Sequence, residues 1–280
     1  MSRKIQLLIA YDGSNFHGWQ AQPEFRTVQG VLADAVRRVV RHPVEVMGSG
    51  RTDAGVHAAG QVAHFETTCG IPAFNLRLAI GSRLPKDITL VRIREVHPDF
   101  HAIRSTISKC YRYRVYSTSD RPVGELRDRC TYHFWHPIDD DRVRAGARLF
   151  VGTRDFSAMA STHAPRESYV RQVMRVDVFR RFHELIIDVE GGGFLYRQVR
   201  NMVGTLLEVG RGHWEPQRVA EILDSRNRSN AGPTAPAKGL CLQWVRYPPQ
   251  LLRPSAQVSA EDQLQPPPGR PGNHLAPCDS

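Results

Sequence analysis

Apolar positions divide the first part of the chain into alternating strands and helices. A buried strand ending in a turn is predicted at residues 4–13, where apolar residues run together. Residues 28–41 carry apolar side chains at helical spacing, with Thr27 in the N-cap position. Residues 88–96 alternate apolar and charged side chains, as a half-buried strand does. Further strands are expected at 44–49, 60–67 and 108–117, and a short helix is expected at 76–84.

The same reading of the pattern continues after a loop rich in Asp, Arg and Pro at 119–141. Asp139 is placed to cap a helix over about 140–150, and a strong helix is predicted at 194–209. On that helix Arg200 lies at the edge of the apolar arc. A β-hairpin across 169–191, a helix at 216–224 and a strand at 239–247 complete the pattern. The order of elements predicts an α+β fold of two related halves, residues 1–118 and 119–247, although no repeat proves a duplication.

Composition changes after Tyr247. Eight of the 19 prolines lie in the last 33 residues, where aromatic residues are few and no periodicity is found. Residues 248–280 are therefore predicted to form a disordered, proline-rich tail. The charged residues of this tail sum to −1, so the excess of positive charge belongs to the folded part.

The charge balance indicates a polyanionic partner. The chain has 38 Lys and Arg against 28 Asp and Glu, a formal net charge of +10, and only four of the 38 are lysines. Arginine presents a planar fork of donors that suits phosphate groups and stacks on bases. A GC-rich genome would explain the preference for Arg over Lys but not the net excess. We therefore expect RNA or DNA as a partner, ahead of a membrane surface.

Cysteine usage and hydropathy bear on location. The five cysteines are widely spaced without a CxxC pair, which argues against a disulfide framework and against a thiolate zinc site. The apolar run near the N-terminus is too short for a signal peptide, and no stretch has the length of a membrane span. These features predict a soluble, cytoplasmic protein without a membrane partner.

One glycine-rich loop, "GSGRTDAGVHA" at residues 48–58, contains a single carboxylate, Asp53. An Asx-turn is the ordinary role of Asp beside glycines. A phosphate cradle is disfavoured, because the loop has neither GxxxxGK[ST] nor GxGxxG spacing. A metal site of Asp53, His57 and His64 is disfavoured, because the histidines lack ligand spacing and no second carboxylate is near. The remaining role is nucleophilic or general-base chemistry by one carboxylate on a nucleic-acid substrate.

The neighbours of Asp53 suit that last role. Arg51 would favour the charged form of the carboxylate and could also bind a substrate phosphate. Glycines without a Cβ would let a nucleotide approach the backbone closely. His57 receives no chemical role.

Five motifs in order carry a resemblance to a known family. The loop segment "GSGRTDAGVHAAGQVAHFET" resembles the active-site segment of the tRNA pseudouridine synthase A family. The other four are "LLIAYDGSNFHGWQAQP…TVQGVL", "DFHAIRSTISKCYRYRVY", "GGFLYRQVRNMVGTLLEVGRG" and "APAKGLCLQWVRY". The resemblance spans about residues 4–248 and leaves the tail without a counterpart. It implies the pseudouridine synthase fold, in which two α+β halves with mostly antiparallel sheets join around a basic central cleft.

The resemblance also implies roles for single residues. Asp53 would be the essential aspartate, and the detached uracil would rejoin the ribose through its C5 atom. Arg51 would aid extrusion of the target base from the stack. Tyr111 would stack on the flipped uracil, and Arg200 would pair with Asp53. The reaction would need no cofactor, metal or nucleotide, because it is an isomerisation.

The expected partner is tRNA, modified in its anticodon arm at positions 38–40 by a homodimer. His101 and Arg104, in the motif "FHAIR", and Lys109 correspond to regions that contact tRNA. Arg112 and Arg171 are further candidates for phosphate contacts, and each could equally be a surface charge. The rival reading is a non-catalytic RNA-binding module of the RRM type, which gives no reason for the Asp53 loop. A metal-dependent nuclease would need a second acidic ligand.

Overall fold

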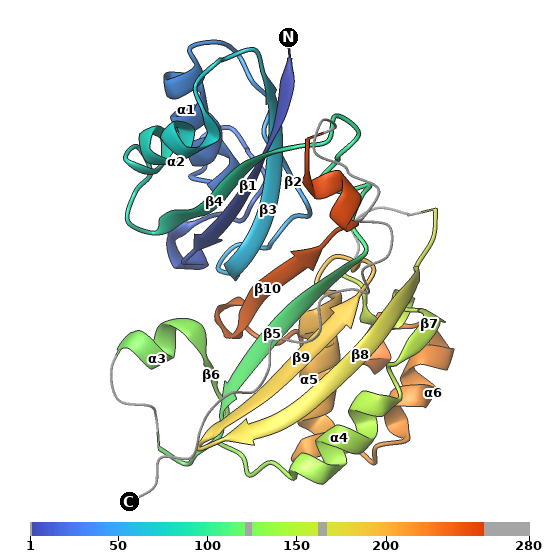
Figure 1. Cartoon of the computed structure of the whole chain (residues 1–280). Helices are drawn as coiled ribbons and strands as arrows, with labels where there is room; N and C mark the ends of the chain where they lie inside the picture. The colour runs from blue at the N-terminus through green and yellow to red at the C-terminus, as the bar shows by residue number, and fades with distance from the viewer. Residues whose placement is uncertain (1, 121–124, 162–166, 255–280) are drawn as a thin grey trace, which may run out of the picture.

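The computed structural model describes residues 2–120, 125–161 and 167–254 (Figure 1). Its strands are β1 (Arg3–Tyr11), β2 (Met47–Gly48), β3 (His57–Thr67), β4 (Ile88–Val96), β5 (Ser108–Tyr116), β6 (Tyr132–His133), β7 (Gly152–Asp155), β8 (Val170–Arg181), β9 (Glu184–Gly191) and β10 (Leu240–Arg246). Its α-helices are α1 (Val28–Val40), α2 (Ala73–Gly81), α3 (Glu125–Cys130), α4 (Asp140–Arg148), α5 (Gln198–Gly210) and α6 (Arg218–Ser225). Short 3-10 helices are η1 (Gly13–Asn15), η2 (Ser157–Met159), η3 (Arg228–Asn230), η4 (Ala237–Gly239) and η5 (Pro249–Leu252).

One continuous sheet runs through the molecule in the order β4-β1-β3-β10-β5-β9-β8-β7, with β2 beside β3 and β6 beside β5. Its pairs are antiparallel except for β10 with β3 and β5 with β6. The predicted α+β class with mostly antiparallel pairing is thus confirmed, but the two expected halves share a single sheet. The strand β5, which sequence analysis placed in the first half, pairs with β9 and β10.

The N-terminal part follows the sequence pattern closely. Alternate residues of β1, such as Ile5 and Leu7, are fully buried in the core cluster that also contains residues of α1 and α2. The Thr27 side chain accepts a hydrogen bond from the Gly30 amide and caps α1 as predicted. The predicted strand at 44–49 is reduced to the two residues of β2.

The C-terminal part differs from the prediction at α5. Asp139 caps α4 as expected, by accepting from the amides of Asp141 and Arg142. The helix predicted from residue 194 begins only at Gln198, because Arg197 takes a left-handed backbone conformation with φ of 59°. The residues before it form a loop. No helix of the described residues is long and apolar enough to cross a membrane.

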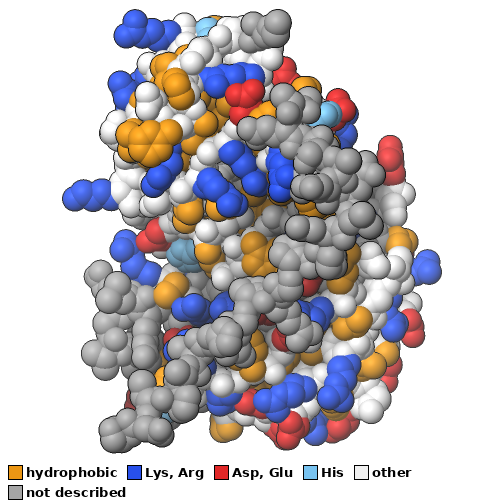
Figure 2. All heavy atoms as spheres, viewed as in Figure 1, with side chains coloured by type: hydrophobic (Ala, Val, Ile, Leu, Met, Phe, Trp, Pro, Cys, Tyr) orange, Lys and Arg blue, Asp and Glu red, His pale blue; other side chains and the backbone are white. Residues whose placement is uncertain are grey.

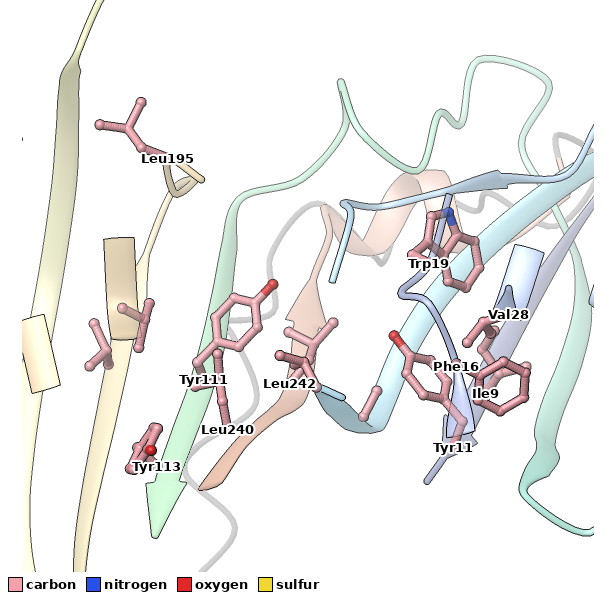
Figure 3. Close-up of a cluster of buried hydrophobic side chains, with 14 of the residues drawn as sticks. Ile9, Tyr11, Phe16, Trp19, Val28, Tyr111, Tyr113, Leu195, Leu240 and Leu242 are labelled. Carbon is pink, nitrogen blue, oxygen red and sulfur yellow. The ribbon is translucent and has the colours of Figure 1, made fainter. Parts of the chain in front are cut away.

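Apolar side chains connect the two parts of the sheet. Tyr111 on β5, Leu240 and Leu242 on β10, and Tyr11 and Trp19 of the N-terminal part belong to one core cluster (Figure 3). This continuity fixes the two parts relative to each other, and so positions the groups that each part contributes to the site.

A smaller apolar cluster lies on the opposite face of the sheet. It contains Tyr247, and Leu251 and Leu252 of η5 pack against it. The amide of His97 donates to the Leu251 carbonyl at 3.2 Å. The chain therefore continues in regular structure over the first residues of the segment predicted as a tail, whereas residues 255–280 of that segment lie outside the described part.

Candidate active site

A cavity of about 1040 Å³ lies where the two parts of the sheet meet, and Asp53 lines it. The Asp53 loop, β5, β10 and the segment that leads into α5 contribute to its walls. Its described lining residues are His17, Gln20, Gln22, Gly50, Arg51, Thr52, Asp53, Ala54, Val56, Lys109, Tyr111, Ser161, Phe194, Leu195, Tyr196, Arg197, Gln198, Val199, Arg200 and Leu240.

Backbone hydrogen bonds hold the Asp53 loop in place. The Trp19 amide donates to the Thr52 carbonyl at 3.0 Å, and the Gly55 amide donates to the Phe16 carbonyl at 3.3 Å. The Val56 amide closes a turn on the Asp53 carbonyl at 3.1 Å. The backbone of the loop is thus held on both sides of Asp53. The Asp53 side chain lines the cavity.

Arg200 of α5 pairs with Asp53 across the cavity wall. Its Nη1 atom donates to the Asp53 Oδ2 atom at 2.7 Å, and its Nε atom donates to the Ala235 carbonyl at 2.7 Å. The two side chains are only 12% and 17% exposed, so little water screens the pair. The pairing implied by the family resemblance is therefore present.

Tyr111 lines the cavity beside this pair. Its ring meets that of Phe194 edge to face, with centroids 5.4 Å apart. Burial raises the pKa of the Tyr111 hydroxyl, and the nearby carboxylate of Asp53 raises it further. The residue therefore presents a neutral aromatic side chain within reach of the carboxylate.

Arg51 does not make the ion pair that sequence analysis allowed. Its Nε atom donates to the Gln20 Oε1 atom at 3.0 Å, and the side chain is exposed at the cavity rim. The cation in contact with Asp53 is Arg200, and the expected influence of Arg51 on the carboxylate stays a prediction. Arg51 remains available for a ligand at the rim.

Lys109 lies two residues before Tyr111 on β5 and also lines the cavity. Its ammonium group donates to the Ser49 carbonyl, at the start of the Asp53 loop. Burial lowers the pKa of Lys109 to about 8. The side chain thus joins β5 to the loop and brings a positive charge to the wall.

The cavity does not include His101 or Arg104. The His101 Nδ1 atom accepts from the amides of Ile103 and Arg104, at 3.2 and 3.3 Å. The centroid of the His101 ring lies 5.0 Å from that of the His64 ring. On β3, His64 points to the face opposite to Phe65, which belongs to the main core. His101 therefore lies on the other face of the sheet. Figure 2 shows Lys and Arg side chains grouped over β1, β3 and β4 on the face toward the viewer.

The histidines weighed as metal ligands bind backbone groups. The His57 Nδ1 atom accepts from the Gly13 amide at 3.1 Å, and its Nε2 atom lies 3.0 Å from the Arg129 carbonyl. The His64 Nδ1 atom accepts from the Ala102 amide at 3.3 Å, and burial lowers the pKa of His64 to about 4. Among the described residues, no three His, Cys, Asp or Glu side chains are grouped as metal ligands would be.

The fold itself requires two glycines of the Asp53 loop, one for packing and one for its backbone conformation. A Cβ atom on Gly48 would lie 2.4 Å from ring atoms of Trp19, and Gly55 has a φ of +79°. Sequence analysis attributed these glycines to the approach of a nucleotide. That explanation fits Gly50, which lines the cavity, but not Gly48 or Gly55.

Sequence reasoning missed Arg197. It lines the cavity three residues before Arg200, and its backbone is left-handed. Its buried Nε atom has no hydrogen-bond partner among the residues that the structure describes. Its guanidinium lies 4.8 Å from the centroid of the Tyr196 ring. A strained cation with an unused donor is typical of a binding site. The only available signal was the i, i+3 spacing to Arg200.

A family profile and the curated sequence relatives agree on one family. The profile of a family described as tRNA pseudouridine synthase matches residues 7–103 and 147–248. tRNA pseudouridine synthase A of Acetivibrio thermocellus is 42% identical over 245 residues, 88% of this chain and 100% of that protein. The protein of that name from Coxiella burnetii is 39% identical over 251 residues, 90% of this chain and 95% of that protein. A solved Cbf5-Nop10-Gar1 complex aligns at 12% identity and a TM-score of 0.33, over 85% of this chain and 57% of that chain.

Proposed function

The chain belongs to the tRNA pseudouridine synthase family, and from this membership we propose that it isomerises uridine to pseudouridine in tRNA. We propose the anticodon arm, at positions 38–40, as the place of modification. One observation supports the chemistry above others: a single carboxylate, Asp53, is paired with Arg200 at the wall of a cavity that could hold a nucleotide.

The proposed reaction breaks one glycosidic bond and forms another. Asp53 attacks the uridine or assists the cleavage of the bond from N1 to the ribose. The uracil turns in the cavity, its C5 atom bonds to the same ribose carbon, and the hydrogen of C5 leaves as a proton while N1 takes one up. Reactants and products are isomers, so the proposal needs no external oxidant or energy source.

The other residues receive roles as substrate contacts. Tyr111 would stack on the flipped uracil beside Asp53. Arg51, Lys109 and Arg197 would contact phosphates of the extruded nucleotide, and the unused Nε donor of Arg197 supports its inclusion. Because the target base must leave the stack, cations around the cavity would also compensate the charge of the distorted backbone.

His101 and Arg104 would contact a different part of the tRNA from the target uridine, because they lie on the other face of the sheet. We also propose a cytoplasmic homodimer, as the family resemblance implies. The thiols of Cys69, Cys110 and Cys241, which form no disulfide within the described residues, are in keeping with a reducing compartment. Light scattering on the purified chain checks the oligomeric state.

The test is release of the C5 hydrogen from unmodified tRNA carrying labelled uridine, followed by mapping of pseudouridine. Wild type should release label without added metal and in the presence of a chelator. Asp53→Asn should lose roughly 10⁴-fold or more in rate, because the amide is neither nucleophile nor base. Undiminished release by Asp53→Asn would contradict the proposal, as would mapping of pseudouridine outside the anticodon arm.

A further inference from the structure

A loop at residues 232–239, between η3 and β10, lies directly behind Arg200 and is called here the 232–239 loop. It is joined to Arg200 twice: the Ala235 amide donates to the Arg200 carbonyl at 3.2 Å, and the Arg200 Nε atom donates to the Ala235 carbonyl at 2.7 Å. The guanidinium that binds Asp53 is thus oriented by the backbone of this loop.

On the side of α5, polar contacts and close packing fasten the loop. The Gly232 amide donates to the Thr205 Oγ1 atom at 3.1 Å, and the Thr234 hydroxyl donates to the Asn201 Oδ1 atom at 2.7 Å. A Cβ atom on Gly204 would lie 1.7 Å from the Pro233 carbonyl oxygen, so helix and loop are in direct contact.

On the side of β5, the contact is made by Tyr113. Its hydroxyl donates to the Pro236 carbonyl at 2.7 Å, one residue after Ala235. Its ring fills the space beside Gly239, where a Cβ atom would come within 2.6 Å of it. Packing in the core accounts for the buried ring of Tyr113 but not for the hydrogen bond of its hydroxyl.

We propose that Tyr113 is a positioning residue for the isomerisation: its hydroxyl holds the 232–239 loop against β5, and the loop in turn holds Arg200 in the orientation that binds Asp53. Tyr111 and Tyr113 thus serve the same site in different ways, the first facing the substrate and the second acting from behind the cation. Burial raises the pKa of the Tyr113 hydroxyl well above its usual range, so it remains a donor at the pH of the reaction. The inference rests on the proposed function.

The first test is Tyr113→Phe, which removes the hydroxyl and keeps the ring. We expect kcat for C5 hydrogen release to fall roughly tenfold, since misplacement of a catalytic charge is costly, with KM for tRNA unchanged. Ile80→Val, a core change in α2 away from the cavity, is the control for a loss of stability alone. A kcat of Tyr113→Phe equal to that of Ile80→Val would overturn the inference.

The second test is a double-mutant cycle with Arg200→Lys. A lysine keeps the charge but offers one ammonium group where arginine uses separate donors for Asp53 and Ala235. If Tyr113 acts through Arg200, adding Tyr113→Phe to Arg200→Lys should lower kcat by less than roughly twofold. If the factors by which the two single substitutions lower kcat multiply in the double variant, Tyr113 does not act through Arg200.

A third measurement does not depend on activity. Hydrogen exchange of the Ala235 amide should be faster in Tyr113→Phe than in wild type and Ile80→Val, because the loop has lost one attachment. Unchanged exchange would overturn the inference even if the enzyme is active. Absence of C5 hydrogen release by wild type, with faster exchange in the variant, would instead contradict the proposed function and leave the role of Tyr113 in the loop standing.

Discussion

The two sides of the cavity hold their charged groups by different means. Asp53 stands on an irregular loop that backbone hydrogen bonds and glycine packing keep in place. Arg200 stands in the first turn of α5, a helix of which nearly every residue is buried. The position of the Asp53 carboxylate therefore depends on a few loop contacts. The position of the Arg200 guanidinium depends on the groups that orient its long side chain. Variants on each side of the cavity test this difference.

The largest effect is expected where the two sides meet. Arg200→Met leaves the poorly exposed carboxylate of Asp53 without its cation and should cost about 3 kcal/mol of the free energy of unfolding. Adding Asp53→Asn should restore part of that loss, because the uncompensated charge is then removed. Urea unfolding of the single and double variants measures both. A double variant no more stable than Arg200→Met would mean that the pair is less shielded than its geometry indicates.

The loop side is probed by Gly48→Ala. The new methyl group would overlap the Trp19 ring, so we expect a loss of about 2 kcal/mol in unfolding free energy and a lower kcat. Gly70→Ala is the matched control, because no described residue lies within 4 Å of the position of its Cβ atom. Equal stability of the two variants would remove the packing explanation for Gly48.

The lowered pKa of Lys109 predicts that kcat/KM depends on pH. Since its pKa is lowered to about 8, the group is an ammonium ion below that pH and a neutral amine above it. Phosphate binding by this residue should therefore weaken as pH rises through about 8, and kcat/KM should fall by a few-fold. Lys109→Arg stays charged over this range, so its profile should lack that falling limb. If kcat/KM of both wild type and Lys109→Arg falls as pH rises through about 8, a group other than Lys109 is titrating.

The smallest effect concerns the chain end. Ending the chain after Arg253 should change neither stability nor activity, because η5 is retained. Ending it after Tyr247 removes Leu251 and Leu252 from the smaller apolar cluster and should cost about 1 kcal/mol, since both are only partly buried. Thermal unfolding of the two truncated chains separates these cases. Equal melting temperatures would show that η5 contributes nothing to the fold.

Local pattern predicted what local forces determine. The span of β4 and the caps Thr27 and Asp139 agree with the structure, because alternation and capping depend on residues near in sequence. The pairing of β5 with β9 and β10 could not be predicted from periodicity, since it is a long-range choice. The start of α5 was missed because a left-handed Arg197 has no sequence signal.

The site shows the same division. Asp53 was found from its own loop, whereas its partner Arg200 came from the family resemblance. Hydrogen bonding drew Arg51 to Gln20, a residue 31 positions earlier, which no spacing rule would reveal. The attachment of Arg200 to Ala235 likewise depends on a loop that returns from 35 residues further along the chain. Contacts of this kind follow from the fold as a whole.

The place of β10 has a consequence for the order of events during synthesis. The last strand in the described part of the chain, β10, lies between β3 and β5, in the middle of the sheet. Asp53 leaves the ribosome long before residues 240–246 do, by roughly ten seconds or more at ordinary rates of translation. Until then the two parts of the sheet have no common strand, and the walls of the cavity have no fixed relation. A nascent chain therefore carries Asp53 before the cavity around it is complete, and we expect activity only when translation is nearly finished.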